Sequence, residues 1–168
     1  MKKLLLLFIL IFAVQISAQQ RTGGSKNRPP ISAAKSVTAK ITQFLEKESG
    51  YTKVSENVWT IPYEGKSLAR FNVIVTTDPD SKFVVMLVVI AKKKDLRLSQ
   101  DLLYTILKYN DLADQVKAGI DQDGDLFLRA EISGRLIDLQ EFRSVVEQMA
   151  AASDQLHGQI SSSLASTP

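Results

Sequence analysis

The chain has 168 residues, of which 45% are hydrophobic and 23% are charged. These values are typical of one globular domain rather than of a disordered or multi-span membrane protein. The formal net charge is +3, but without residues 1–18, which contain Lys2 and Lys3, 19 basic side chains stand against 18 acidic ones. This near balance excludes a general nucleic-acid binder, and the absence of cysteine excludes disulfides, thiolate metal sites and a cysteine nucleophile.

The first residues have the three-part pattern of a secretory signal peptide. Lys2 and Lys3 precede the uncharged apolar run 4–14, and Ala18 supplies a small residue for cleavage. We therefore expect a leader over residues 1–18, cleaved near Ala18, and a protein exported to the periplasm or the medium that meets the membrane only through this transient leader. A retained anchor is the alternative, although the run is short for a span of about 20 residues.

A domain over residues 33–158 is expected to follow a flexible linker. Residues 19–32 are rich in glycine, proline and basic side chains and carry almost no apolar surface to bury. An apolar stripe at helical spacing from Val37 to Leu45 then predicts a helix over about 33–49.

Three strands are predicted after this helix. Residues 57–63 and 68–77 are rich in β-branched and aromatic side chains. Pro62 withholds a backbone donor, which favours an edge position for the first of these strands. Residues 83–91 are apolar at every position, and this pattern predicts a central strand that is covered on both faces.

A β-hairpin centred on Asp123-Gly124 is the clearest unit of the second half. Two alternating runs within residues 116–132 flank this dipeptide, which tolerates the positive φ angles of a tight turn. A helix capped by Ser99 is expected before the hairpin, to about Asn110. After it, Asp138 and Glu141 form a capping-box pattern for a helix over 139–157. Residues 159–168 have no apolar period and are expected to be a disordered tail.

The resulting order, α-β-β-β-α-β-β-α, predicts an α+β domain with a mostly antiparallel five-stranded sheet and flanking helices. In this order of elements, a resemblance to a known family is carried by the aromatic strand around Trp59, the segment LLYTILKYN (102–110), the stretch DGDLFLRAEI (123–132) and the helix over 142–154. Through these stretches the chain resembles the YbjN-like domain family. The resemblance spans about residues 35–157 and implies the fold of the small type III secretion chaperones. It also implies a non-catalytic protein-binding or regulatory module that is often dimeric and needs no cofactor.

Few side chains in the sequence suggest catalysis or metal binding. Asp121, Asp123 and Asp125 lie beside Gly124, but the spacing departs from an EF-hand loop, and turn chemistry explains the same residues. We therefore predict no metal and no catalytic residues. Two alternatives stay open, namely an envelope hydrolase that uses Glu131 with the three turn aspartates, and a structural or ion-tuned domain.

A protein or peptide partner is the favoured function. Trp59 and Tyr63 flank Pro62 on the predicted edge strand, and aromatic side chains on such an edge are typical anchors for a partner segment. The same edge could be closed by a second copy of the chain, which would give a homodimer. His157 is the only histidine and is interpreted as a surface side chain.

Overall fold

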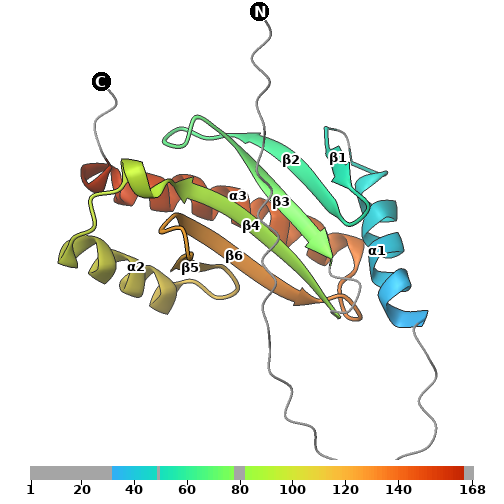
Figure 1. The fold of residues 1–168 in the computed structure, drawn as a ribbon. Helices are drawn as coiled ribbons and strands as arrows, with labels where there is room; N and C mark the ends of the chain where they lie inside the picture. Colours follow the sequence, from blue (N-terminus) through green and yellow to red (C-terminus); the bar gives the residue numbers. More distant parts are fainter. Residues whose placement is uncertain (1–31, 49, 78–81, 165–168) are drawn as a thin grey trace, which may run out of the picture. The chain divides into compact units, whose positions relative to one another are not determined.

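A six-stranded antiparallel sheet with the strand order β1-β2-β3-β4-β6-β5 forms the frame of the domain (Figure 1). The computed structural model describes residues 32–48, 50–77 and 82–164. The predicted leader, its cleavage point at Ala18 and the linker up to residue 31 lie outside these ranges. The strands are β1 (Thr52–Ser55), β2 (Val58–Glu64), β3 (Arg70–Thr77), β4 (Phe83–Ala91), β5 (Lys117–Ile120) and β6 (Leu126–Ser133). The helices are α1 (Ser32–Leu45), α2 (Gln100–Leu112) and α3 (Leu139–Gln159), with short 3₁₀ turns η1 (Lys93–Asp95) and η2 (Ser161–Ser163).

The α+β class and the element order predicted from the sequence are confirmed, with one additional strand. β1 pairs with β2 through Thr52 opposite Thr60 and Lys53 opposite Trp59. All of its side chains are exposed, so it buries no apolar face and lacks the alternation that identifies a strand in a sequence. β1 pairs only with residues 58–60 of β2, so Pro62 lies on a stretch of β2 that has β3 as its single strand partner in the described ranges, as its missing backbone donor suggested.

One face of the sheet carries the core. Along β4, Val84, Met86, Val88 and Ile90 are buried, whereas the residues between them are half-buried or exposed. The prediction that β4 is covered on both faces is therefore wrong. A run of apolar residues does not by itself distinguish a strand covered on two faces from one that leaves aliphatic side chains at the surface.

Helices α1 and α3 cover this buried face. In Figure 1, α3 runs behind the sheet, and it contacts β3, β4 and β6. The rings of Phe44 in α1 and Phe142 in α3 lie 5.7 Å apart, and the Thr38 and Thr77 hydroxyls are 2.8 Å apart, which joins α1 to β3. Both predicted caps are confirmed, since Ser99 Oγ accepts a hydrogen bond from the Leu102 amide and Asp138 Oδ1 accepts one from the Glu141 amide.

The predicted hairpin is confirmed, with a longer turn than its central dipeptide suggests. The β5–β6 turn spans residues 121–125, and Gly124 has a φ of +87°, in the region that favours glycine. The amide of Gly124 donates to the Asp121 carbonyl, and the amide of Asp121 donates to the Asp125 carbonyl. Beyond the turn, Leu126, Leu128 and Ala130 are buried on one side of β6, as alternation predicts.

The expected disordered tail is wrong for residues 159–164. Ile160 is buried, and η2 brings Leu164 into a β-bridge with Leu96. The Arg97 amide donates a 2.8 Å hydrogen bond to the Ser163 carbonyl. This segment is ordered by contacts with distant residues, which a local reading of its serine-rich sequence does not reveal. No helix in the described ranges has the length and apolar character needed to cross a bilayer.

Candidate functional site

The surface of the sheet opposite α1 and α3 is the most distinctive feature of the described residues, and we call it the open face. Directly paired residues of antiparallel strands point to the same side, so the strand register defines this face. It is formed by Val58, Thr60, Pro62 and Glu64 of β2, Arg70, Asn72, Ile74 and Thr76 of β3, Phe83, Val85, Leu87 and Val89 of β4, Phe127, Arg129, Glu131 and Ser133 of β6, and Lys117 and Gly119 of β5.

The centre of the open face is apolar. Val89 is 39% exposed, and Val85, Leu87 and Ile74 are half-buried among their strand neighbours. Phe127 lies across β5, where a Cβ atom on Gly119 would come 2.9 Å from its ring. A solvated sheet face normally carries polar side chains. The aliphatic side chains left at the surface of this central strand therefore make the open face a candidate binding surface.

A charged pair lies beside this apolar centre. The Arg129 guanidinium forms an ion pair with the Glu131 carboxylate through its Nη2. The alternation that predicted Arg129 and Glu131 on the same face of the strand is confirmed. Glu131 lies in β6, six residues after Asp125, which corresponds to about 20 Å of extended chain. The structure therefore does not bring Glu131 together with the turn aspartates, as the hydrolase alternative requires.

Helix α2 exposes a second apolar surface. Leu103, Tyr104 and Leu107 are exposed, with Leu107 at 67%. Asp101 and Lys108 lie one heptad apart on the same side of the helix as Tyr104, and the Lys108 ammonium is 4.7 Å from the centre of the Tyr104 ring. The opposite side of α2, with Leu102, Ile106 and Tyr109, is buried in the core.

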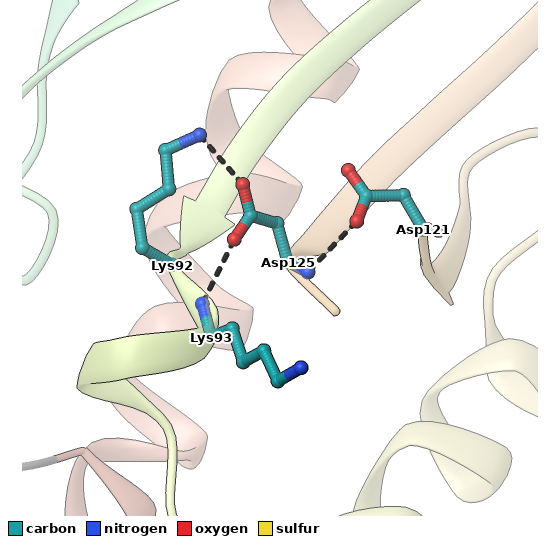
Figure 2. Close-up of polar contacts among 4 residues, drawn as sticks. All are labelled: Lys92, Lys93, Asp121 and Asp125. Carbon is teal, nitrogen blue, oxygen red and sulfur yellow. Dashed lines mark hydrogen bonds and ion pairs between the residues drawn. The ribbon is translucent and has the colours of Figure 1, made fainter. Parts of the chain in front are cut away.

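Two of the three turn aspartates, Asp121 and Asp125, are engaged in hydrogen bonds within the protein. Figure 2 shows Lys92 Nζ and the Lys93 amide converging on the Asp125 carboxylate, at 2.6 and 2.8 Å. Asp121 Oδ1 accepts a hydrogen bond from the Asp125 amide at 2.8 Å. Burial would raise the pKa of Asp125, but the hydrogen bonds from Lys92 and Lys93 and the Lys92 charge hold it below its usual value.

This network has a structural role, because it fastens the end of β4 to the β5–β6 turn. Among the residues that the structure describes, no group of three or more histidine, cysteine, aspartate or glutamate side chains could hold a metal ion. Turn chemistry and an internal ion pair therefore account for Asp121 and Asp125, and Asp123 is exposed at the tip of the turn.

Trp59 does not lie at an accessible edge. Its side chain is fully buried beneath the helix-covered face, where it is paired with Val75 of β3. Its indole Nε1 has no hydrogen-bond partner in the described part of the chain. The premise that made Trp59 a partner-binding residue is therefore wrong.

Tyr63 lies on the same side of β2 as Trp59 but nearer the margin of the domain. Its ring stacks on Phe71 with 5.9 Å between the ring centres, and the side chain is half-buried. Burial raises the pKa of the Tyr63 phenol, and the carboxylates of Glu147 and Glu48 add to this effect. Tyr63 therefore lies away from the open face, and its contact with a partner stays a prediction.

One polar contact was missed by the sequence analysis. Ser67 Oγ lies 2.8 Å from His157 Nδ1, and Asp154 Oδ1 accepts the amides of Ser67 and Leu68 at 2.7 and 2.8 Å. These backbone amides hold the pKa of Asp154 below its usual value. The cluster fastens the β2–β3 turn to the end of α3. Because the turn and the helix end are about 90 positions apart in the chain, no local pattern could reveal the contact.

Comparison with known proteins identifies the fold. No protein-family model matches the sequence, and no curated protein is similar to it in sequence. Among solved structures, YbjN from Escherichia coli aligns with 13% identity and a TM-score of 0.56 over 77% of this chain and 96% of that one. A chain of the HopA1–SchA chaperone–effector complex aligns with 14% identity and a TM-score of 0.54 over 77% and 97%.

A third solved structure extends this likeness. A chain from the structure of the Yersinia pestis type III secretion chaperone SycH with a fragment of YscM2 aligns with 15% identity and a TM-score of 0.50, over 73% of this chain and 98% of that one. The resemblance inferred from Trp59, LLYTILKYN and DGDLFLRAEI is therefore confirmed at the level of the fold, which is that of YbjN and the type III secretion chaperones. Identities this low establish the fold alone.

Proposed function

We propose that this chain is a non-catalytic, chaperone-like binding module that holds a segment of another protein on the open face of its sheet. The observation that carries the proposal is the row of half-buried and exposed aliphatic side chains, Val85, Leu87 and Val89, on a central strand. Such side chains gain free energy when a partner removes them from water. Relative to the sequence analysis, the proposed surface moves from the Trp59 edge to the opposite side of the sheet.

The structural neighbours support a protein partner. The SycH structure contains a fragment of YscM2, and the SchA structure is a chaperone–effector complex. Each of these structures is a complex of two proteins and contains a chain with the fold of this protein. The partner of this chain is inferred from its own open face rather than transferred from theirs.

Export is part of the same proposal. The leader predicted over residues 1–18 would deliver the domain to the periplasm or the medium. The domain would then meet its partner outside the cytoplasm. Immunoblotting of cell fractions tests export, because the domain should be found in the periplasm or the medium. The exported chain should also be shorter than the full-length chain by the length of the leader, since cleavage is expected near Ala18.

A homodimer through α2 is the second element of the proposal. Asp101 and Lys108 lie on either side of Tyr104 along the same stripe of the helix. If two copies of α2 packed antiparallel across a two-fold axis near Tyr104, each Asp101 would face the Lys108 of the other copy, and Leu103 and Leu107 would be covered. A surface that is complementary to itself in this way suits an isologous interface.

Site-specific photo-crosslinking in the producing cell tests the binding proposal. A photoreactive residue replaces Val89 in one variant and Leu136, which is 73% exposed in the turn between β6 and α3, in the control. We expect a defined protein to be crosslinked at position 89 and not at position 136. Identical products at both positions, or none at position 89, would exclude the open face as the binding surface.

A further inference from the structure

Arg129 is a cationic residue of the open face that lies next to its apolar centre, directly opposite Leu87. In the strand register it lies between Leu87 of β4 and Lys117 of β5. Its side chain is 42% exposed, so part of the guanidinium is accessible to another molecule. At the same time, its Nε atom is shielded from solvent and has no hydrogen-bond partner among the described residues.

The hydrogen-bonding capacity of Arg129 is therefore not used up within the domain. A guanidinium carries five N–H donors in a planar fork, and two parallel bonds to a carboxylate are its strongest pairing. Glu131 contacts Nη2 from a position two residues along the same strand. Because Glu131 engages Nη2, the accessible part of the Arg129 guanidinium keeps N–H donors that can bind a second acceptor.

The local charge balance also favours a negatively charged partner group. Arg129 and Lys117 are direct cross-strand neighbours, and like charges in this position repel each other. Lys117 turns its ammonium group toward the Asn110 and Ala113 carbonyls at the end of α2. Of the two carboxylates that the register places on the open face, Glu64 is paired with Arg70 and Glu131 with Arg129, so Lys117 leaves this part of the surface with an excess positive charge.

We propose that the segment held on the open face combines apolar side chains with an aspartate or glutamate, and that Arg129 binds the carboxylate of this residue. This inference rests on the proposed function and adds the chemistry of the partner. The apolar side chains cover Leu87 and Val89, while the carboxylate reaches the accessible end of the Arg129 guanidinium. Glu131 acts as an internal competitor that occupies Arg129 until the partner binds.

Selection from a random linear peptide library tests this inference. The mature domain is used as wild type, as Arg129→Gln and as Glu131→Gln, each checked for an unchanged circular dichroism spectrum. Peptides that also bind a folded Val89→Lys variant are discarded, so that only ligands of the open face remain. The measured quantity is the frequency of aspartate and glutamate in the remaining sequences relative to the starting library.

We expect acidic residues to be enriched next to apolar ones for the wild type, more strongly for Glu131→Gln, and not at all for Arg129→Gln. For one selected peptide, replacing its acidic residue by the amide should weaken binding about tenfold to the wild type. The same replacement should leave binding to Arg129→Gln unchanged. The difference between the two measurements gives the interaction energy between Arg129 and the acidic residue of the peptide.

The outcomes separate this inference from the function on which it rests. If no peptide depends on the open face, both proposals fail. If open-face peptides are found without acidic enrichment, or if the enrichment persists in Arg129→Gln, a protein-binding face remains and the role of Arg129 is overturned.

Discussion

Leu87 of β4 lies directly opposite Arg129 of β6 on the side of the sheet that α1 and α3 leave uncovered. An aliphatic side chain and a guanidinium are thus neighbours on one accessible surface. The apolar group favours removal from water, and the charged group favours an oriented partner. A surface that recognises one partner needs both kinds of group, because the apolar area buried on binding gives affinity but a charged group gives specificity.

The two sides of β4 should respond differently to truncation. Val88 is fully buried beneath the helices, so Val88→Ala should lower the free energy of unfolding by about 2 kcal/mol through lost burial and a residual cavity. Val89 is exposed on the open face, so Val89→Ala should change it by less than about 0.5 kcal/mol. Urea unfolding measures both values, and equal losses would mean that the open face is covered.

Trp59 should matter for stability. Trp59→Ala should cost about 3–5 kcal/mol because the side chain is fully buried. Trp59→Phe should cost clearly less, since it keeps an aromatic ring and removes an indole N–H that has no partner in the described residues. Thermal unfolding of the two variants tests this, and an unchanged melting temperature for Trp59→Ala would contradict the burial.

Asp125 should make the free energy of unfolding of the domain depend on pH. Its hydrogen bonds from Lys92 and Lys93 hold its pKa below the usual value, so its contribution is complete above the unfolded pKa of about 4 and is lost as pH falls through the lower folded pKa. Asp125→Asn should therefore destabilise the domain by about 1–3 kcal/mol at neutral pH, and this difference should shrink under acidic conditions.

The neighbouring Asp123 supplies the control for this measurement. It lies exposed in the same turn, so Asp123→Asn should leave stability nearly unchanged. Urea unfolding at neutral and acidic pH compares the two variants. A difference between the wild type and Asp125→Asn that does not vary with pH would argue against the Lys92 contact.

The α2 interface can be tested by charge reversal. Asp101→Lys should weaken the proposed dimer, because two lysines would then face each other across the two-fold axis. Lys108→Asp added to the same chain should restore it. Sedimentation equilibrium gives the dissociation constants, and a wild type that remains a monomer at high concentration would refute the arrangement.

Local patterns predicted much of the fold. The caps at Ser99 and Asp138, the Asp123-Gly124 turn and the burial of Leu126, Leu128 and Ala130 follow from spacings of a few residues. The exposed strand β1 could not be predicted from such spacings, because its four side chains are all exposed and show no alternation of apolar and polar residues. The order of residues 159–164 likewise depends on distant contacts with Leu96 and Arg97.

The candidate site was harder to predict than the fold. Pro62 indicated an edge, and residues 61–64 of β2 do lack a second strand partner in the described ranges, but Trp59 lies on the helix-covered side of the sheet and is a core residue. To predict the open face, one must know which side of β4 the helices cover. The nine residues of β4 are all apolar, so their sequence does not indicate which side is buried. Alternation within β6 did predict that Arg129 and Glu131 share a face, and this is the part of the site that the sequence contained.

The most direct measurement is calorimetric titration of the segment identified by crosslinking at position 89 into three forms of the domain. These are the wild type, Val89→Lys and the matched surface control Leu136→Lys. Val89→Lys should weaken binding by at least about tenfold, as expected when a charge enters an apolar anchor site, and Leu136→Lys should bind as the wild type does. Equal affinity of a folded Val89→Lys variant and the wild type would contradict the claim that the open face holds the partner.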